Sequence, residues 1–278
     1  MTKRALVIEG GGFRGAYAAG VVYGLLTQAP EITFDVVVAN SSSVSTGAYF
    51  VTKQAKELNG IWVDEKSVGS PKVLSWWRAP ISFYKSFMNI DYVFDELMTK
   101  DYRLDLNALQ KSKIDYFVTA MEFPTGRRHQ FSNRDPQIWD AMRASCAVPW
   151  AYIGKIVIRG QRYIDGFYDS IPLRIAKEQG CDDIWIVSTR PKGYRKGRLK
   201  LFEILPLKHC RLLAKRHLYY NETAEEIEAS DRYKVIRPEV KLPVSRLTNN
   251  AQEISEIFEM GQKDFKKFLL CRNKKLKS

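Results

Sequence analysis

The sequence predicts an α/β fold with a mostly parallel central sheet and a helical C-terminal annex. Two stretches repeat the order strand, turn, helix: an apolar strand at residues 5–8 precedes a helix at 16–26, and a strand at 35–39 precedes a helix at 42–58. The second strand is an apolar, β-branched run, which is typical of a parallel strand covered on both faces. With 278 residues the chain is long enough for one such domain with an annex.

The remaining elements follow from apolar patterns bounded by turn residues. Strands are expected at 115–121 and 128–132, joined by Pro124-Thr125-Gly126, at 155–158 and 161–164, joined by Arg159-Gly160, and at 184–188. Helices are expected at 138–144 and 171–179 and, in the annex, at 207–228 and 251–270 on either side of a short strand at 233–236. We therefore expect residues 1–190 to form the main domain and residues 191–278 a basic, mainly helical annex packed on it.

Positive charge is in large excess and is unevenly distributed. The formal net charge is +13 and the pI is about 9.5, and the densest basic cluster lies between residues 190 and 217. Such an excess favours an anionic partner, either a phospholipid surface or a nucleic acid, although a solvated charged face is the default interpretation. No nucleic-acid recognition motif accompanies the basic residues, so a nucleic acid is not the expected partner.

The cysteines and the N-terminus indicate a cytoplasmic protein without a metal. Cys146, Cys181, Cys210 and Cys271 are widely spaced and form no C-x-x-C pair, so neither a structural metal nor a disulfide framework is expected, and no cofactor is implied. The N-terminus has no cationic and apolar leader, and no run reaches 18 apolar residues. We therefore expect neither a signal peptide nor a transmembrane segment, and at most peripheral contact with a membrane.

The first strand runs into a turn of unusual composition, Glu9-Gly-Gly-Gly-Phe-Arg-Gly15. Successive glycines let the backbone turn sharply with several N–H groups pointing one way, and Arg14 adds a positive charge where a helix begins. Such a turn binds an anion, either a phosphate or the oxyanion that forms when an acyl carbonyl is attacked. A dinucleotide site would need an acidic residue at the end of the second strand, whereas Asp35 lies at the start of that strand.

A run of serines follows the second strand and contains two candidate nucleophiles. A nucleophile elbow is usually written G-x-S-x-G, because small flanking residues let strand and helix approach; here the stretch is Ala39-Asn-Ser-Ser-Ser-Val-Ser-Thr-Gly47. Ser41 directly follows the strand and has Ala39 and Ser43 as flanks. Ser45 has Ser43 and Gly47 as flanks but leaves spare residues after the strand. We prefer Ser41 and keep Ser45 as the alternative; a third interpretation is that these serines only cap the helix.

Asp165 is the candidate base. It stands at the end of an expected strand and is followed by Gly166, which lets the chain turn away and leaves the carboxylate facing the site. His129 precedes it in a strand, and His209 and His217 lie in the annex, so no histidine falls where a Ser-Asp-His order would end. A Ser-Asp dyad therefore explains the pattern better than a triad.

These motifs resemble those of the patatin-like phospholipase family, in which G-G-G-x-R-[KRG] forms the oxyanion hole, G-x-S-x-G carries the nucleophile and D-G-[AG] carries the base. The resemblance implies a three-layer α/β sandwich and a serine acyl-ester hydrolase of the phospholipase A or lipid acyl hydrolase type, acting on phospholipid or another lipid ester. It also implies that residues 1–190 form the catalytic domain, with Ser41 and Asp165 as the catalytic dyad. The oxyanion hole would comprise Gly10, Gly11, Gly12, Phe13, Arg14 and Gly15.

The resemblance extends over nearly the whole chain. Residues 142–149 resemble the family's R-A-S-x-A-x-P segment, and stretches at 189–196, 220–223 and 236–238 resemble a bacterial subgroup of uncharacterised patatin-like proteins. The elbow glycines, however, fall on Ala39 and Ser43, and the third motif reads Asp165-Gly166-Phe167, with a bulky last residue. These departures motivate an alternative function, a catalytically impaired lipid- or phosphate-binding protein, because a nucleophile needs its strained turn whereas a binding site does not.

An aromatic-rich segment and a basic loop bear on how a lipid would reach the site. The segment contains Trp62, Trp76, Trp77, Phe83, Tyr84, Phe87, Tyr92 and Phe94. It is either the wall of an apolar pocket, a surface that touches lipid, or irregular core packing. We expect the basic loop at residues 190–200 to turn the pocket towards an anionic membrane, with Trp76 and Trp77 at the interface.

Overall fold

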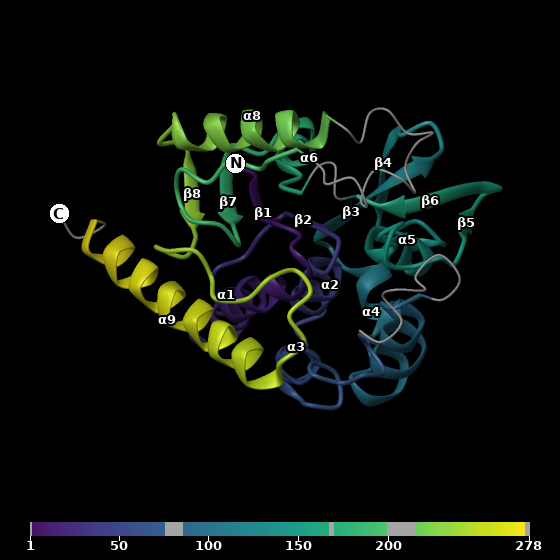
Figure 1. Ribbon diagram of the computed structural model, residues 1–278. Helices are drawn as coiled ribbons and strands as arrows, with labels where there is room; N and C mark the ends of the chain where they lie inside the picture. Colours follow the sequence, from purple (N-terminus) through teal and green to yellow (C-terminus); the bar gives the residue numbers. More distant parts are fainter. Residues whose placement is uncertain (1, 76–85, 167–169, 199–214, 276–278) are drawn as a thin grey trace.

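The computed structural model describes residues 2–75, 86–166, 170–198 and 215–275 and confirms the predicted fold class (Figure 1). The described residues form one mixed, mostly parallel sheet of eight strands with helices on both faces. A long helix, α9 (Ala251–Lys275), ends the described part of the chain. No helix among the described residues carries an uncharged apolar stretch long enough to cross a bilayer.

The parallel strands form a continuous block at one end of the sheet. The strands are β1 (Arg4–Ile8), β2 (Val36–Asn40), β3 (Asp115–Phe123), β4 (Arg128–Ser132), β5 (Ile156–Ile158), β6 (Gln161–Asp165), β7 (Asp183–Val187) and β8 (Tyr233–Ile236). Their order is β5-β6-β3-β2-β1-β7-β8, with β4 paired to β3. Neighbours from β3 to β8 are parallel, whereas β4 and β6 join β3, and β5 joins β6, in antiparallel pairs.

Helices cover both faces of this sheet, which gives three layers (Figure 1). Besides α9, they are η1 (Gly12–Arg14), α1 (Gly15–Gln28), α2 (Ser43–Val51), α3 (Ala55–Val63), η3 (Tyr92–Asp101), α4 (Leu106–Lys111), α5 (Ile138–Cys146), α6 (Leu173–Glu178) and α8 (Arg216–Glu228). Alternate residues of β1 face opposite layers, as the two-residue period of a strand requires. Leu6 and Ile8 pack in one core with α1, α2, α5 and α9, whereas Ala5 and Val7 pack in a second core with α6 and α8.

The predicted helix at 42–58 is wrong, because the chain breaks it into α2 and α3. Lys53, between them, has a φ of +61°, which a helix does not allow. The side chain of Gln54 holds the break: its Nε2 donates to the Arg103 carbonyl at 2.8 Å, and its Oε1 accepts from the Asp105 amide at 2.9 Å. These partners are about fifty residues away in sequence, so helical periodicity alone does not reveal the break.

The C-terminal part is joined to the sheet more closely than an annex would be. Strand β8 pairs in parallel with β7, so the sheet continues beyond residue 190, where we expected it to end. Helix α9 packs lengthwise against α1, with Phe258 and Phe265 fully buried. Helix α8 begins at Arg216, and the earlier part of the helix expected at 207–228 lies outside the described residues.

The carboxyl ends of the parallel strands meet at one edge of the sheet, where ligand sites form in such folds. Strand β1 leads there into the glycine turn, and β2 leads into Ser41. Strand β3 brings the ends of β2 and β6 together. Asn40, at the end of β2, pairs with Thr119 of β3, and Asp165, at the end of β6, pairs with the next β3 residue, Ala120. The sheet therefore holds Ser41 and Asp165 next to each other at this edge.

Candidate active site

Ser41 occupies a strained turn between β2 and α2. Its φ is +53°, in the left-handed region that residues other than glycine rarely adopt. The amide of Ser41 donates to Ser145 Oγ at 2.8 Å, and its carbonyl accepts from the Val44 amide at 3.0 Å and from Cys146 Sγ at 3.2 Å. Strain at a strand-to-helix turn, held by neighbouring contacts, is the geometry of a nucleophile elbow.

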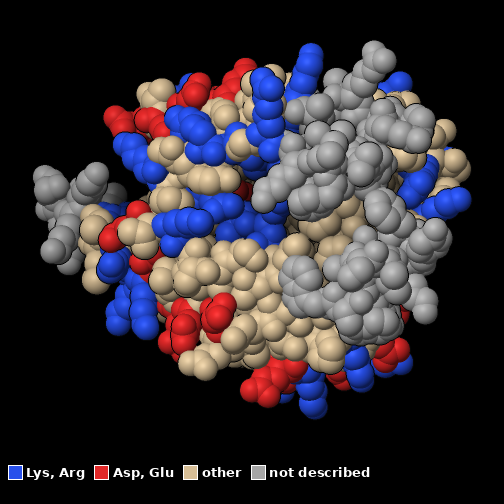
Figure 2. Space-filling view, in the orientation of Figure 1, with Lys and Arg blue, Asp and Glu red and all other residues tan. Residues whose placement is uncertain are grey.

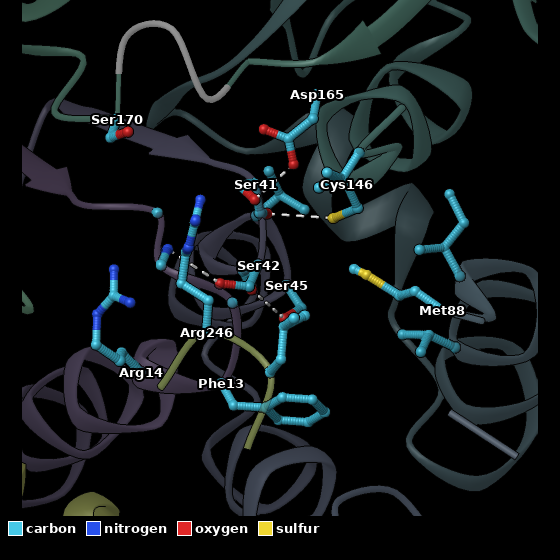
Figure 3. Close-up of a pocket in the computed structure, with 18 of the residues that line it drawn as sticks. Phe13, Arg14, Ser41, Ser42, Ser45, Met88, Cys146, Asp165, Ser170 and Arg246 are labelled. Atoms are coloured by element: carbon cyan, nitrogen blue, oxygen red, sulfur yellow. Dashed lines mark hydrogen bonds between the residues drawn. The ribbon is translucent and has the colours of Figure 1, made fainter. Parts of the chain in front are cut away.

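The structure brings Ser41 and Asp165 together. Ser41 Oγ donates a hydrogen bond of 2.7 Å to Asp165 Oδ2 (Figure 3). Asp165 is fully buried, and its amide donates to the Ala147 carbonyl at 3.0 Å. Among the described residues that line the neighbouring cavity, Asp165 is the sole carboxylate. A hydroxyl on a strained turn and a buried carboxylate acceptor are the groups that an acyl-transfer site needs.

Ser45 has a different environment. It lies in the first turn of α2, and its Oγ donates to the Ser42 carbonyl at 3.3 Å, one helical turn back (Figure 3). No described carboxylate accepts a hydrogen bond from it. The interpretation that the serines only cap the helix would need a hydrogen bond from a backbone amide of α2 to the N-cap side chain. Ser42 is at the N-cap of α2, and its side chain makes no such bond. Of the two candidate nucleophiles, Ser41 alone has a carboxylate within hydrogen-bond distance among the described residues.

The two departures from glycine at the elbow are accommodated by other residues. A Cβ atom on Gly47 would lie 3.0 Å from the Ala39 Cβ and 2.8 Å from the Tyr116 ring, so Gly47 provides the close approach of α2 to β2. Ser43 is fully buried, and its Oγ donates to the Glu9 carbonyl at 2.7 Å. The side chain at position 43 therefore ties the elbow to the glycine turn rather than obstructing it.

Asn40, which the sequence did not single out, links the two ends of the candidate dyad through Gly166 and Ser145. Asn40 Nδ2 donates to the Gly166 carbonyl at 3.0 Å, and Ser145 Oγ donates to Asn40 Oδ1 at 3.3 Å. A Cβ atom on Gly166 would lie 2.5 Å from Asn40 Oδ1, so glycine is required there. Ser145 belongs to the R-A-S segment noted in the sequence, whereas Asn40 carried no signal of its own. Phe167 lies outside the described residues.

The glycine turn lies directly against the elbow. A Cβ atom on Gly10 would lie 2.6 Å from the Asn40 carbonyl oxygen, and one on Gly15 would lie 2.8 Å from Ser42 Oγ. Gly12 has a φ of +60°, and the Arg246 backbone packs against it. These contacts explain the glycines at positions 10, 12 and 15 by close approach and backbone conformation.

Two of the backbone donors in this turn already have partners. The Gly10 amide donates to the Ser170 carbonyl at 3.0 Å, and the Phe13 amide donates to the Arg246 carbonyl at 3.2 Å. The Gly11 amide makes a long contact of 3.4 Å with Ser42 Oγ, and the Gly12 amide has no partner among the described residues. The donors left for an anion in this arrangement are therefore Gly11 and Gly12, a narrower set than the sequence predicted.

A cavity of about 400 Å³ lies beside Ser41 and has two chemically different sides. We call its apolar lining from residues 61–98 the apolar side; it includes Trp62, Met88, Ile90, Phe94, Leu97 and Met98. The cationic side is formed by Arg14, Arg190, Lys196, Arg198, Arg216 and Arg246. In Figure 3, Met88 lies on one side of Ser41 and Asp165, and Arg14 and Arg246 lie on the other.

The described residues of the aromatic-rich segment fall into different environments. Trp62 and Phe94 are buried and line the cavity, so the pocket-wall interpretation holds for them. Phe87 is buried against Trp150, with ring centroids 5.9 Å apart, and belongs to a small apolar cluster. Outside the described residues lie Trp76, Trp77, Phe83 and Tyr84. The expectation that Trp76 and Trp77 lie at a membrane interface therefore stays a prediction.

The described histidines lie away from the dyad. His129, on β4, is 3.1 Å from a carboxylate oxygen of Glu122 on β3, and His217 lies on α8. Neither lines the cavity, and His209 is outside the described residues. Within the described ranges no three His, Cys, Asp or Glu side chains lie close enough together to hold a metal ion.

The described basic residues of the loop, at 190–198, divide between two environments, and the expected contact of this loop with an anionic membrane stays a prediction. Arg195 is paired with Glu225 and Glu228 at 3.3 and 3.0 Å, whereas Arg190 and Lys196 line the cavity. Lys196 is partly exposed as a residue, and its Nζ donates to Ser170 Oγ at 2.7 Å. Burial of this ammonium and the nearby charge of Arg216 hold the pKa of Lys196 well below its ordinary value.

Cys146 is next to the dyad but is chemically unsuited to attack. Burial and the neighbouring carboxylate of Asp165 raise the pKa of the Cys146 thiol well above its ordinary value. A raised pKa keeps the thiol protonated at neutral pH, and the thiolate is the reactive form. We therefore expect iodoacetamide at pH 8 to alkylate the exposed Cys271 well before Cys146, as measured by mass spectrometry of the two peptides. Equal rates of labelling at Cys146 and Cys271 would contradict the raised pKa and the burial of Cys146.

Two family models match the sequence. The model described as "Patatin-like phospholipase" matches residues 6–177, and one described as a domain of unknown function (DUF6363) matches residues 208–273. The first match contains the glycine turn, the elbow at Ser41 and the strand that ends at Asp165. The second match falls on the C-terminal part, which supplies Arg216 and Arg246 to the cavity.

A curated relative and a solved structure are also similar to the chain. "Uncharacterized protein YjjU" of Escherichia coli (strain K12) is 25% identical over 193 residues, which are 67% of this chain and 52% of the relative. The chain thus spans about half the length of that relative. The crystal structure of VipD from Legionella pneumophila matches with a TM-score of 0.50 and 12% identity, over 96% of this chain and 66% of that one. At this identity the similarity concerns the fold alone.

Proposed function

Because the chain belongs to the patatin-like phospholipase family, which implies lipid ester substrates, we propose that it is a lipid acyl hydrolase with Ser41 as nucleophile and Asp165 as base. The observation that carries the proposal is the combination of strain and contact at Ser41. Its φ of +53° is costly for serine, and its Oγ donates to the Asp165 carboxylate at 2.7 Å. Strain of this kind clusters at functional sites, which supports a catalytic role for Ser41 over the binding alternative.

The proposed reaction uses this chain's own groups throughout. Asp165 accepts the proton of Ser41 Oγ as the oxygen attacks the carbonyl carbon of the lipid ester. The tetrahedral intermediate collapses, and the alcohol leaves with the proton that Asp165 returns. A water molecule then attacks the acyl-enzyme while Asp165 takes its proton. As the bond between Ser41 Oγ and the acyl carbon breaks and the fatty acid leaves, Asp165 returns that proton to Ser41 Oγ.

We assign the oxyanion donors to the amides of Gly11 and Gly12. Both line the cavity beside Ser41, and neither is committed to a backbone acceptor among the described residues. Donors fixed in advance stabilise the charge that develops on the carbonyl oxygen, an effect worth about 3 kcal/mol per donor in acyl-transfer enzymes. Arg14, which belongs to this turn and is 5% exposed, adds positive charge to the same region.

The apolar side of the cavity suits the acyl chain. Its lining residues, such as Met88, Phe94 and Leu97, come from residues 61–98 and offer no charged group to the chain. Burial of apolar surface contributes about 25 cal/mol per Å². Contact with an anionic membrane also stays a proposal, now attached to the exposed Lys192 and Arg198 rather than to the whole basic loop.

A fluorophosphonate probe tests the choice of nucleophile directly. We expect the wild-type protein to be labelled covalently, with the adduct on the peptide that contains Ser41, because the probe reacts with an activated serine. Ser41→Ala should abolish labelling, whereas Ser45→Ala should leave it in place, since Ser45 Oγ bonds to a backbone carbonyl instead of a carboxylate. Labelling that disappears in Ser45→Ala alone would reverse the assignment.

A further inference from the structure

The cationic side of the cavity is not explained by ester hydrolysis. Six Lys and Arg residues line the cavity, and the sole described carboxylate in its lining is Asp165, which serves Ser41. A fatty acyl ester is uncharged, so the reaction itself needs no such concentration of positive charge. Figure 2 shows Lys and Arg side chains gathered around a hollow on this face, with a broad uncharged surface next to it.

Three of these cations lack a carboxylate partner within the described part of the chain. Arg14, 95% buried, forms no ion pair, and its Nε has no hydrogen-bond partner there. Arg190 and Lys196 likewise form no ion pair with a described carboxylate. Burial and the charges of Arg190 and Arg246 lower the pKa of Arg14 to about 10. Buried like charges of this kind are costly unless an anion compensates them.

Glu9 is a carboxylate whose charge acts on Arg14 and Lys196, and its own contacts hold it in the cavity wall. Its Oε2 accepts from Ser188 Oγ at 2.6 Å and from the Thr189 amide at 2.7 Å, and its Oε1 accepts from Tyr220 at 3.3 Å. Glu9 is 1% exposed and does not line the cavity. The negative charge of Glu9 thus offsets part of the positive charge of this group from within the protein. Glu9 does not occupy the cavity, where a ligand would contact the cationic side.

Aromatic rings orient the cationic groups without neutralising them. The Arg190 guanidinium lies 4.2 Å from the Tyr194 ring centroid, Lys196 Nζ lies 4.3 Å from that of Tyr220, and the Arg246 guanidinium lies 5.9 Å from that of Trp150. A cation over a ring keeps the N–H donors at its edge available, which applies here to Arg190. By contrast, Arg195 in the same loop is paired with two glutamates outside the cavity.

Five of the six cationic residues lie beyond residue 177, where the patatin-like match ends, and they converge on Arg14 of the glycine turn. We propose that this cationic side binds the phosphoryl group of an anionic phospholipid, so that the C-terminal part of the chain selects the substrate by its headgroup. The inference rests on the proposed hydrolase function. The acyl chain then occupies the apolar side, the scissile ester lies at Ser41, and the phosphoryl group lies among the arginines, which bind its oxygens as bidentate donors.

The test compares two substrates that differ by the phosphoryl group alone: dioctanoyl phosphatidic acid and dioctanoylglycerol. For the wild-type protein we expect a higher kcat/KM on the phosphatidic acid. In Arg190→Gln/Arg246→Gln the ratio of the two kcat/KM values should fall about tenfold to a hundredfold, since hydrogen bonds to charged groups are lost. The single variant Arg190→Gln, at a partly exposed position, should shift the ratio in the same direction.

Arg195→Gln is the matched control, because Arg195 lies in the same loop but pairs with Glu225 and Glu228. We expect its substrate ratio to equal that of the wild type. An unchanged ratio in both the single and the double variant would overturn the proposal. So would an equal shift in Arg195→Gln, which would indicate a general effect of surface charge.

A binding measurement separates this proposal from the hydrolase function. In full-length Ser41→Ala, dioctanoyl phosphatidic acid should raise the Tm with increasing concentration, dioctanoylglycerol should not, and the rise should be lost when Arg190 and Arg246 are also replaced. A wild type without esterase activity would refute the hydrolase function, yet this shift would still demonstrate the phosphoryl site. Stabilisation by inorganic phosphate without stabilisation by the lipid would identify a free-phosphate site and overturn the headgroup assignment.

Discussion

Ser41→Ala is expected to lower kcat for hydrolysis of a p-nitrophenyl ester by about 10⁴-fold, because the oxygen that would form the acyl-enzyme is removed. Asp165→Asn should cause a loss of similar size, since its Oδ2 is the acceptor of the Ser41 proton and an amide does not take that proton. The two losses should not add in the double variant, because the residues act as one unit. Steady-state kinetics on the three variants measures this.

Ser45→Ala provides the matched control, because Ser45 lies four residues after Ser41, in the first turn of α2. Its Oγ contacts the Ser42 carbonyl rather than Asp165, so we expect kcat to stay within about threefold of the wild type. Circular dichroism of each variant checks that the fold is retained. Wild-type turnover in both Ser41→Ala and Asp165→Asn would exclude the dyad. The alternative, a non-catalytic lipid- or phosphate-binding protein, requires instead that the wild type itself has no esterase activity.

Gly20→Ala is expected to lower the free energy of unfolding by about 1–3 kcal/mol, although alanine is the better helix former. A Cβ atom on Gly20 of α1 would lie 1.9 Å from the carbonyl oxygen of Phe258 in α9, and one on Gly261 of α9 would lie 2.1 Å from that of Tyr17 in α1. Both contacts are with backbone, which a rotamer change does not relieve. Helix propensity favours alanine by about 1 kcal/mol, and the clash outweighs that gain.

Urea unfolding of the full chain measures the Gly20→Ala effect, and Gly261→Ala should behave alike because the two glycines face each other's helix. Gly197→Ala is the control, since a Cβ atom there meets nothing within 4 Å. We expect that change to stay within about 0.5 kcal/mol of the wild type. A Gly20→Ala protein as stable as the wild type would mean that α1 and α9 pack less closely than described.

The order of elements was predictable because it depends on local patterns. The apolar runs at β1, β2 and β7 and the glycine turn are contiguous in sequence, and their periodicity and turn residues specify strand, turn and helix. The break between α2 and α3 was not predictable in this way. It depends on Gln54 binding backbone groups at Arg103 and Asp105, and such long-range contacts leave no periodic signal.

The candidate dyad also depends partly on local sequence patterns and partly on long-range contacts. Small residues after β2 narrowed the nucleophile to Ser41 or Ser45, and the sequence favoured Ser41 while keeping Ser45 as the alternative. The positive φ of Ser41 and its 2.7 Å contact with Asp165, 124 residues away, distinguish them in the structure. That contact exists because β3 pairs with β2 on one stretch and with β6 on the next, and strand pairing is a property of the whole sheet.

By itself the sequence determined the α/β class, the glycine turn and the residue types of a Ser-Asp site, since each is written in a short contiguous stretch. The tertiary structure decided which amides of the turn stay free, because the Arg246 carbonyl takes that of Phe13. It also decided where the basic residues go: Arg195 turns to two glutamates, while Lys196, next to it in sequence, turns into the cavity. Side-chain direction and long-range proximity arise from packing, so a charge pattern alone does not reveal a binding site.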